Sequence, residues 1–326
     1  MAPRNVPLHR LGKNGPLVPA LGLGLMGMGI MYGIPPSDEE RFAVLDRAVE
    51  IGATNWDTSD FYGDCESLVG KWFKRTGKRD EIFLATKFGV VKGSSDFAIN
   101  SSGPYVREAL EASLQALGTD YVDLYYMHRA NSNTPIEETA RALAELKAEG
   151  KIKHIGLSEV SSTTLRRASK IVHIDAVQIE YSLFDLDIEN SEGTDLLAAC
   201  RELGTATVAY SPLGRGLLTG TLNSTENINK EGDWRSMFPR FIGENYEANI
   251  KLVNRFKSFA DNKGCTPGQL AIAWLLKQGD DIIPIPGTKR TKYLEENWGA
   301  LKVQLTDEEV AEIRHFAETN KVVGER

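Results

Sequence analysis

The sequence predicts a single (β/α)8 barrel, or TIM barrel, over residues 1–326. Short apolar runs of the kind found in buried parallel strands alternate with amphipathic helix patterns along the chain. No linker, low-complexity tract or close internal repeat interrupts this alternation, which favours one domain built from parallel βα units. Eight such runs are typical of a closed barrel rather than an open doubly wound sheet.

The helix patterns begin and end at clear signals. A capping box over residues 37–40 predicts a helix that ends at Gly52. A second helix is expected to begin at Pro104 and end at Gly118, and a third to begin at a capping box over residues 134–137. The strand-like runs lie between the helix patterns, at residues 20–23, 53–56, 82–86, 122–127, 152–157, 176–179, 206–209 and 282–285.

Two additions to the barrel are expected. Residues 10–18 are predicted to form a β-hairpin ahead of the barrel, because they contain an Asn-Gly pair that favours a tight turn. Residues 211–244, between the seventh and eighth strands, are unusually long for a connection and rich in Gly, Asn, Trp and Phe. We therefore expect a mobile lid loop there, followed by helices near residues 246–263 and 266–278.

Composition narrows the range of partners. The chain is 41% hydrophobic and 25% charged, as in ordinary globular proteins, and its formal net charge is −7. A negative chain is a poor general binder of nucleic acid, so small molecules are the expected partners. Residues 17–36 carry no charge, but their glycines and prolines oppose a membrane-spanning helix. The cysteines are scattered and the N-terminus is not of signal-peptide type. We therefore predict a cytoplasmic protein, monomeric or homo-oligomeric, with free thiols and no metal site.

Chemically active side chains follow the predicted strands. Asp57 and Lys87 end the second and third strands, His128 ends the fourth, and Tyr62 lies in the loop after the second. In this fold the carboxyl ends of all strands meet at one mouth, where active sites lie. An acid, an amine, an imidazole and a phenol at that mouth form a candidate proton-transfer site. The later strands are expected to bring further residues to the same mouth: Ser158, Gln178, Tyr210 and residues 287–290.

Several short motifs occur in a fixed order along nearly the whole chain. They are residues 57–63 (DTSDFYG), Thr86-Lys87, His128, Gly156-Leu157-Ser158, Gln178, residues 210–217 (YSPLGRGL), residues 285–289 (IPGTK) and Glu296-Asn297. In this combination the chain resembles the aldo-keto reductase family, and its SPLGRGLLTG segment is most similar to the microbial and plant branch. The resemblance implies an oxidoreductase that reduces small aldehydes or ketones to alcohols with the NADPH/NADP+ couple.

The residue types suit the implied reaction. Hydride addition to a carbonyl creates an alkoxide that needs a proton, and Tyr62 can donate it. A free phenol has a pKa of about 10, and a neighbouring cation, for which Lys87 is the candidate, is expected to lower that pKa. Asp57 is expected to keep Lys87 charged and oriented. His128 is expected to bond the carbonyl oxygen and help to polarise it.

The resemblance also implies which residues hold the cofactor. Tyr210 matches the aromatic residue that stacks on the nicotinamide, and Ser158 and Gln178 match the side chains that bond its carboxamide. Small residues allow the backbone to approach a pyrophosphate, and hydroxyl and cationic donors suit a phosphate. The expected residues are Ser211, Leu213 and Gly214 at the pyrophosphate, Gly287, Thr288, Lys289 and Arg290 at the adenosine 2′-phosphate, and Glu296 and Asn297 at the adenine.

Two residues depart from the family pattern. Glu159 stands where the family usually has an asparagine after Ser158, and a carboxylate accepts hydrogen bonds but does not donate them. Many members have an arginine near Tyr293 that pairs with the 2′-phosphate. Arg290 is the expected substitute here, so a preference for NADPH over NADH is predicted.

A glycine-rich segment gives a misleading signal. Residues 22–27 match the GxGxxG pattern of Rossmann folds, which requires a helix that opens at the third glycine. The residues that follow, 28–36, oppose a helix, so we interpret the segment as a loop at the barrel mouth. Candidate pocket residues from this loop and others are Met28, Tyr32, Phe61, Phe88, Arg129, Trp234 and Phe238.

The sequence is also compatible with two other functions. A Schiff-base aldolase on the same barrel would use Lys87 as its nucleophile, although the cofactor-like segments after strands seven and eight disfavour it. A non-enzymatic subunit that binds the cofactor as a redox sensor would retain the same four polar residues. The substrate and the direction of the reaction are not determined by the sequence.

Overall fold

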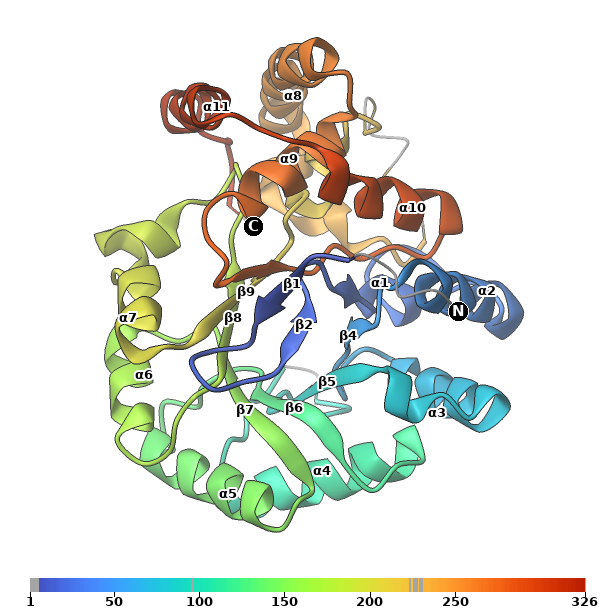
Figure 1. The fold of residues 1–326 in the computed structure, drawn as a ribbon, viewed down its shortest axis with the longest axis vertical. Helices are drawn as coiled ribbons and strands as arrows, with labels where there is room; N and C mark the ends of the chain where they lie inside the picture. Colours follow the sequence, from blue (N-terminus) through green and yellow to red (C-terminus); the bar gives the residue numbers. More distant parts are fainter. Residues whose placement is uncertain (1–5, 95–96, 223, 225–227, 229–230, 326) are drawn as a thin grey trace.

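The computed structural model describes residues 6–94, 97–222, 224, 228 and 231–325. Its centre is an eight-stranded parallel sheet with the order β10-β9-β8-β7-β6-β5-β4-β3, so consecutive strands are neighbours. Helices surround the sheet (Figure 1). The strands are β3 (Leu23–Gly24), β4 (Asn55–Asp57), β5 (Phe83–Phe88), β6 (Val122–Met127), β7 (Ile152–Ser158), β8 (Ala176–Glu180), β9 (Ala206–Tyr210) and β10 (Ile282–Pro284).

Contacts between the first and last strands close the sheet. The N–H of Gly22 donates to the carbonyl of Pro284 at 2.8 Å. Gly24 forms a parallel bridge with Gly287. A Cβ on Gly24 would lie 2.8 Å from the carbonyl oxygen of Ile285, so this close approach requires glycine. The predicted (β/α)8 barrel is confirmed, and all strand ends meet at one mouth because the strands are parallel.

Helices lie along the outside of the barrel, and those before β10 lie between successive strands. Their bounds are α2 (Asp38–Ile51), α3 (Cys65–Thr76), α4 (Gly103–Leu117), α5 (Ile136–Ala148), α6 (Ser162–Ser169), α7 (Leu196–Leu203), α8 (Gly243–Lys263), α9 (Pro267–Leu276), α10 (Thr291–Gly299) and α11 (Asp307–Thr319). None of the helices within the described ranges is both long and apolar enough to cross a bilayer.

Two of the three predicted helix starts are confirmed. The hydroxyl of Ser37 accepts from the N–H of Glu40, whose carboxylate accepts from the N–H of Ser37, so the capping box of α2 forms. Helix α4 begins at Gly103, one residue before the predicted proline, and ends before Gly118. The predicted capping box over residues 134–137 is wrong. Helix α5 begins only at Ile136, with a proline as its N-cap, so the threonine lies one position too early to cap it.

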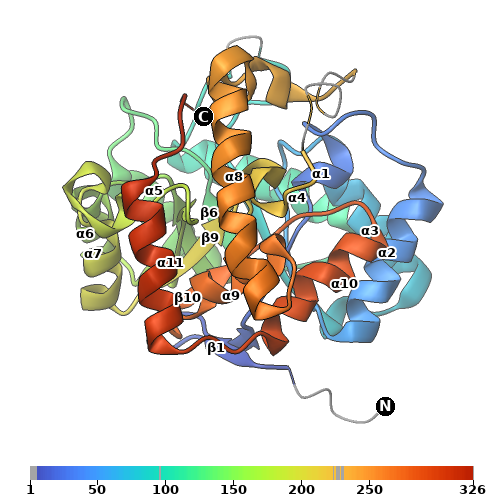
Figure 2. The same ribbon diagram turned by 90° about the horizontal axis from the view of Figure 1, so that it is seen from above.

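The predicted hairpin is present, but its turn differs from the expectation. Strands β1 (Leu8–Arg10) and β2 (Leu17–Pro19) pair antiparallel. They lie at the end of the barrel away from the C-terminus (Figure 2). Residues 11–16 connect them, so the Asn-Gly pair does not form a tight two-residue turn. The left-handed residue is Gly12 (φ 71°), where a Cβ would lie 2.6 Å from the carbonyl oxygen of Asp175.

The long connection between β9 and α8 contains short 3₁₀ helices. They are η4 (Gly214–Thr219), η6 (Trp234–Met237) and η7 (Pro239–Phe241). Helices α8 and α9 follow, as predicted. Part of the predicted lid loop, at residues 223, 225–227 and 229–230, lies outside the described residues.

The glycine-rich segment after β3 contains one turn of helix, which the sequence did not predict. Residues Met26–Gly29 make the four-residue helix α1, and the chain is extended again at Ile30. The prediction that no helix begins here is therefore wrong in detail. A single turn does not provide the long helix that a Rossmann fingerprint needs, so the interpretation as a loop at the mouth holds.

The helix layer packs closely enough to exclude a methyl group at Gly70 of α3. A Cβ there would lie 2.3 Å from the carbonyl oxygen of Ala116 on α4 and 3.0 Å from that of Leu117. Backbone atoms cannot rotate away from such a contact. The glycine therefore sets the distance between these two helices.

We predict that Gly70→Ala lowers the free energy of unfolding by about 1–3 kcal/mol, because the overpacking outweighs the gain in helix propensity. Gly103→Ala is the matched control, since its Cβ would meet its nearest neighbour at an ordinary 3.6 Å. That variant should be neutral or slightly stabilised. Urea unfolding measures both, and equal stabilities of the two variants would contradict the packing argument.

Candidate active site

A buried ion pair lies inside the barrel mouth. The side chain of Lys87 on β5 is fully buried, and its Nζ donates to Oδ1 of Asp57 at the end of β4. The same ammonium donates to the carbonyl of Thr58 at 2.8 Å. Oδ2 of Asp57 accepts from Nε2 of Gln178 on β8 at 2.7 Å. Atoms from both sides of the barrel therefore hold the pair.

Tyr62 and His128 lie beside this pair. Nζ of Lys87 is 4.9 Å from the centroid of the Tyr62 ring. The rings of Tyr62 and His128 meet edge to face, with their centroids 5.7 Å apart. The N–H of His128 donates to the carbonyl of Phe88 at 2.7 Å, which fixes the start of the loop after β6. The structure thus brings together the four side chains that the sequence placed at one mouth.

Burial controls the protonation of these groups. It raises the pKa of Asp57 and lowers the pKa of Lys87, and in each case the partner's charge opposes the shift. Burial, with Lys87 and Arg129, holds the pKa of His128 well below its ordinary value, so its imidazole is neutral at pH 7. Burial, and then the Asp57 carboxylate, raises the pKa of Tyr62. The expected lowering of the Tyr62 pKa is therefore wrong for this structure, and the phenol keeps its proton at neutral pH.

A cavity of about 960 Å³ opens onto these side chains. It is lined by most of the residues that the sequence assigned to the site: Asp57, Tyr62, His128, Ser158, Gln178, Tyr210, Ser211, Leu213, Gly287, Thr288, Lys289, Arg290, Glu296 and Asn297. Lys87 and Gly214 do not line it. Lys87 lies behind Asp57, and Gly214 is a buried residue with φ +55° in the turn next to Leu213.

The pocket candidates divide into two groups. Tyr32, Phe61, Arg129 and Trp234 line the cavity. Three others do not line it: Met28 is fully buried in the core, Phe88 stacks on Tyr125, and Phe238 packs beneath the guanidinium of Arg215. Apolar side chains next to a site have the same sequence signature whether they face the pocket or the core, so these three predictions were wrong.

Glu159, at the position where the family usually has an asparagine, bonds to a neighbouring aromatic side chain. Its Oε1 accepts from the phenol of Tyr210 at 2.8 Å, and its backbone is left-handed at φ 52°. This conformation is costly for a residue that is neither Gly nor Asn. The carboxylate therefore contacts the aromatic residue expected at the nicotinamide, and it does not line the cavity.

The segment after β10 forms a turn at the N-terminus of α10. The hydroxyl of Thr288 accepts from the N–H of Arg290 at 3.1 Å. Nζ of Lys289 donates to the carbonyl of Tyr32 at 2.6 Å, which ties this turn to the loop after β3. The guanidinium of Arg290 lies 5.9 Å from the ring centroid of Tyr293, in the region where the family often has an arginine.

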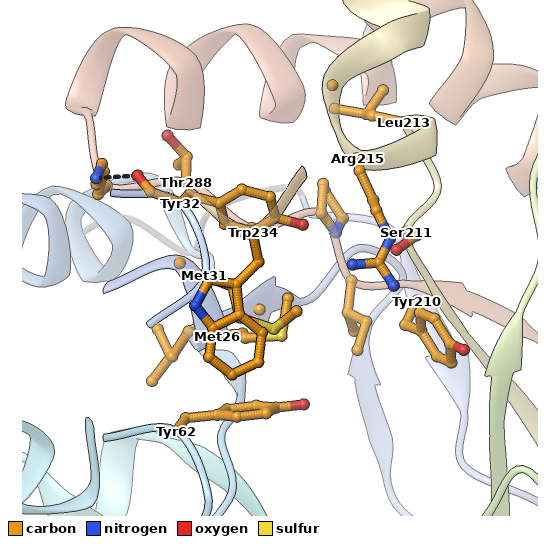
Figure 3. A pocket seen from close by; sticks show the side chains of 18 of the residues that line it. Met26, Met31, Tyr32, Tyr62, Tyr210, Ser211, Leu213, Arg215, Trp234 and Thr288 are labelled. Carbon is orange, nitrogen blue, oxygen red and sulfur yellow. Dashed lines mark hydrogen bonds between the residues drawn. The ribbon is translucent and has the colours of Figure 1, made fainter. Parts of the chain in front are cut away.

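The loops after β3 and β9 pair across the cavity. Tyr32 and Asp233 form an antiparallel bridge, and the N–H of Trp234 donates to the carbonyl of Met31 at 2.9 Å. Figure 3 shows the indole of Trp234 between Tyr32 and Tyr62. The two loops therefore form a strap, residues 31–34 with 231–235, over one side of the site.

Sequence reasoning missed the arginines of the strap region. Arg235 pairs with Asp233 through two bonds of 3.0 and 2.6 Å and donates to the carbonyl of Arg215. The Nε and Nη1 atoms of Arg215 are buried and have no hydrogen-bond partner among the described residues. Its guanidinium points toward Ser211 and Tyr210 (Figure 3). The position of Arg215 within the SPLGRGLLTG segment was the available signal.

The fold and the cavity define a barrel protein with its site at the carboxyl ends of the strands. Residues 20–318 match the model of the family described as "Aldo/keto reductase family". The chain is 48% identical over 326 residues to the aldo-keto reductase yakc [NADP(+)] of Schizosaccharomyces pombe, covering 99% of this chain and 94% of that protein. It is 47% identical to the aldo-keto reductase str7 of Strobilurus tenacellus, covering 98% and 95%.

Solved structures agree with this assignment. The glycerol dehydrogenase AKR11B4 from Gluconobacter oxydans superposes with a TM-score of 0.84 at 26% identity, covering 98% of this chain and 97% of that one. The thermostable aldo-keto reductase Tm1743, in complex with the inhibitor epalrestat, superposes with a TM-score of 0.76 at 31% identity, covering 95% and 100%. The chain belongs to the aldo/keto reductase family, as the sequence motifs predicted.

We predict that the buried ion pair is energetically coupled. Asp57→Asn and Lys87→Met should each lower the free energy of unfolding by about 3–5 kcal/mol, because each leaves one buried charge without its partner. The double variant should lose clearly less free energy of unfolding than the sum of the two single losses. Urea unfolding of the four proteins completes the cycle, and additive losses would contradict the coupling.

The control for this cycle is the exposed pair Lys257–Asp261 on α8, which has the same charges and an N–O distance of 2.7 Å. Lys257→Met should change the free energy of unfolding by no more than about 0.5 kcal/mol, because solvent screens an exposed pair.

Proposed function

We propose that this protein reduces small aldehydes or ketones to alcohols with NADPH. Membership of the family supports carbonyl reduction, and the name of the Schizosaccharomyces pombe relative supports NADP(H) as the cofactor. The observation that carries the proposal is the buried Lys87–Asp57 pair beside Tyr62 and His128 at the wall of the cavity.

Tyr62 is proposed as the proton donor. The cofactor, when bound, supplies the hydride, and the protein supplies position and protons. The raised pKa of Tyr62 keeps the phenol protonated until an alkoxide forms beside it. An alkoxide is a stronger base than a phenolate, so transfer is downhill, and the ammonium of Lys87 stabilises the phenolate that remains. Asp57 orients that ammonium.

His128 is proposed to position the carbonyl oxygen. Its neutral imidazole lines the cavity next to the Tyr62 ring, so an oxygen bonded to both would lie within reach of the proton donor. A neutral ring with a nitrogen-bound proton donates a hydrogen bond without transferring its own proton.

The cavity fits a dinucleotide with phosphate groups. Arg215 presents buried donor atoms that lack a partner within the described part of the chain, which is the arrangement expected for a site that binds an anion. Arg215 and Ser211 are proposed at the pyrophosphate, and Lys289 with Thr288 at the 2′-phosphate. Tyr210, oriented by Glu159, is proposed to stack on the nicotinamide.

The environment of Lys87 weighs against the aldolase alternative. A Schiff-base nucleophile must reach the substrate as a free amine. The amine of Lys87 is fully buried, bonded to Asp57 and Thr58, and absent from the cavity wall. The cytoplasmic location, the lack of nucleic-acid partners and the oligomeric state stay predictions from the sequence.

Replacing the proposed proton donor should strongly lower turnover but leave cofactor binding intact. Tyr62→Phe is expected to lower kcat for reduction of an aromatic aldehyde by about 10²–10⁴-fold, because it removes the hydroxyl that donates the proton and leaves the ring in place. NADPH absorbance measures turnover, and quenching of tryptophan fluorescence measures cofactor binding. Tyr125→Phe, the same change at a buried tyrosine that faces α4, is the control and should retain activity. Unchanged turnover in Tyr62→Phe would exclude this role.

The preference for NADPH should depend on Lys289. Lys289→Met is expected to raise KM for NADPH by about 10–100-fold and to affect KM for NADH much less, because a charge-assisted bond to phosphate contributes about 1.5–3 kcal/mol. Lys292→Met removes a nearby exposed cation that does not line the cavity, and it should change neither value. An equal increase in KM for both cofactors would contradict a bond to the 2′-phosphate. Lys289 would then act only through its bond to Tyr32 in the strap.

A further inference from the structure

The ring nitrogen Nδ1 of His128 has a hydrogen-bond partner that has no role in the proposed mechanism. Nδ1 lies 3.1 Å from Oγ of Ser59, in the loop after β4. The same Oγ lies 3.3 Å from Oδ1 of Asp60 and accepts from the N–H of Phe61 at 3.2 Å. Because Nδ1 faces Ser59, Nε2 is the nitrogen left for the cavity that His128 lines.

The direction of the hydrogen bonds at Ser59 depends on whether Asp60 carries a proton, because a hydroxyl has only one proton to donate. When Asp60 is ionised, Ser59 donates to the carboxylate and accepts from Nδ1–H of His128, so Nε2 carries no proton. When Asp60 is protonated, the carboxyl group donates to Ser59, Ser59 donates to Nδ1, and Nε2 carries the proton. The carbonyl of Lys87, at 3.5 Å from Ser59, is the weaker alternative acceptor.

Asp60 lies in surroundings that bring its titration into the neutral range. The side chain is buried, and its burial, followed by the charge of Glu66 on α3, raises its pKa to about 7. Lys92 after β5 opposes this shift. Lys87 of β5 also interacts with Asp60.

Other titratable and charged groups lie near this chain of contacts. Tyr105 of α4 and Tyr125 of β6 face Asp60 with pKa values raised by burial. Around His128 stand Lys87, Arg129 and Tyr62. Burial, and then the charges of Lys87 and Arg129, hold the imidazole neutral, so the variable that remains is which of its nitrogens carries the proton.

We propose that Ser59 and Asp60 are positioning residues that select the tautomer of His128, with Nε2 protonated when Asp60 is protonated. The consequence for catalysis rests on the proposed carbonyl reduction. Only the Nε2–H form donates to a carbonyl oxygen in the cavity. The kcat/KM for reduction should therefore fall by about tenfold as the pH rises through 7, because ionisation of Asp60 withdraws the donor.

The direct test is ¹⁵N NMR of the imidazole in the free protein, which needs neither cofactor nor substrate. The His128 signals are assigned by their absence in His128→Asn and followed from about pH 5.5 to about pH 8.5, a range that brackets the titration. We expect a change from the Nε2–H to the Nδ1–H tautomer with a midpoint near 7. A single tautomer over the whole range would overturn the proposal, whether or not the protein proves to be a reductase.

Three variants test the role of each residue. Asp60→Asn should hold His128 as Nε2–H at every pH, because an amide donates to Ser59 as the protonated acid does, and it should remove the step near pH 7 from kcat/KM. Ser59→Ala should also remove the transition. Glu66→Gln, at the neighbouring buried carboxylate, should keep the transition and move its midpoint to lower pH, because it removes a negative charge beside Asp60.

The outcomes show whether Asp60 or Glu66 is the group that titrates. A transition that persists with the same midpoint in Asp60→Asn would overturn the proposal. Loss of the transition in Glu66→Gln together with its persistence in Asp60→Asn would identify Glu66 as the titrating group and would overturn it equally.

Discussion

A lysine and an aspartate, paired inside the barrel, determine how the rest of the site is arranged. Removing two charges from water is costly, and the cost is met only when both groups have good partners. Here Lys87 has a carboxylate and a carbonyl oxygen, and both carboxylate oxygens of Asp57 are bonded. Strands β4, β5 and β8, with Thr58 just after β4, supply these atoms, so the pair depends on closure of the barrel. The loops with Tyr62 and His128 then form around a fixed charge.

The lining of the cavity has a small excess of cations, although the chain as a whole is negative. The chain has a net charge of −7, whereas the cavity is lined by Arg129, Arg215, Lys289 and Arg290 together with the acidic residues Asp57, Glu231 and Glu296. A local cluster of cations in a concave site concentrates the field on an anion even when the distant surface is negative. The strap over the cavity adds Arg235, whose charge is matched by Asp233. The site is therefore suited to an anionic dinucleotide, although net charge alone gave no such indication.

Local signals predicted the elements well where the interaction was itself local. The capping box of α2 formed because Ser37 and Glu40 need only each other. The box at residues 134–137 failed because the position at which α5 begins is set by packing, and Ile136 is buried in the core. The Asn-Gly turn failed for the same reason. The hairpin adapts to its contacts at the bottom of the barrel, where Gly12 and Gly204 meet, and the left-handed residue moves to Gly12.

The sequence by itself determined the barrel, the family and the placement of the four polar residues at one mouth. The order of the strands and of the motifs can be read directly from the sequence, and the carboxyl ends of parallel strands lie at the same end of the barrel. The sequence did not determine which way each side chain points or how strongly each is buried. The pKa of Tyr62, the contact of Glu159 with Tyr210, and the unpartnered atoms of Arg215 were decided by tertiary structure. Desolvation and pairing depend on atoms brought from distant strands and loops, and a residue's own neighbours in the sequence do not contain that information.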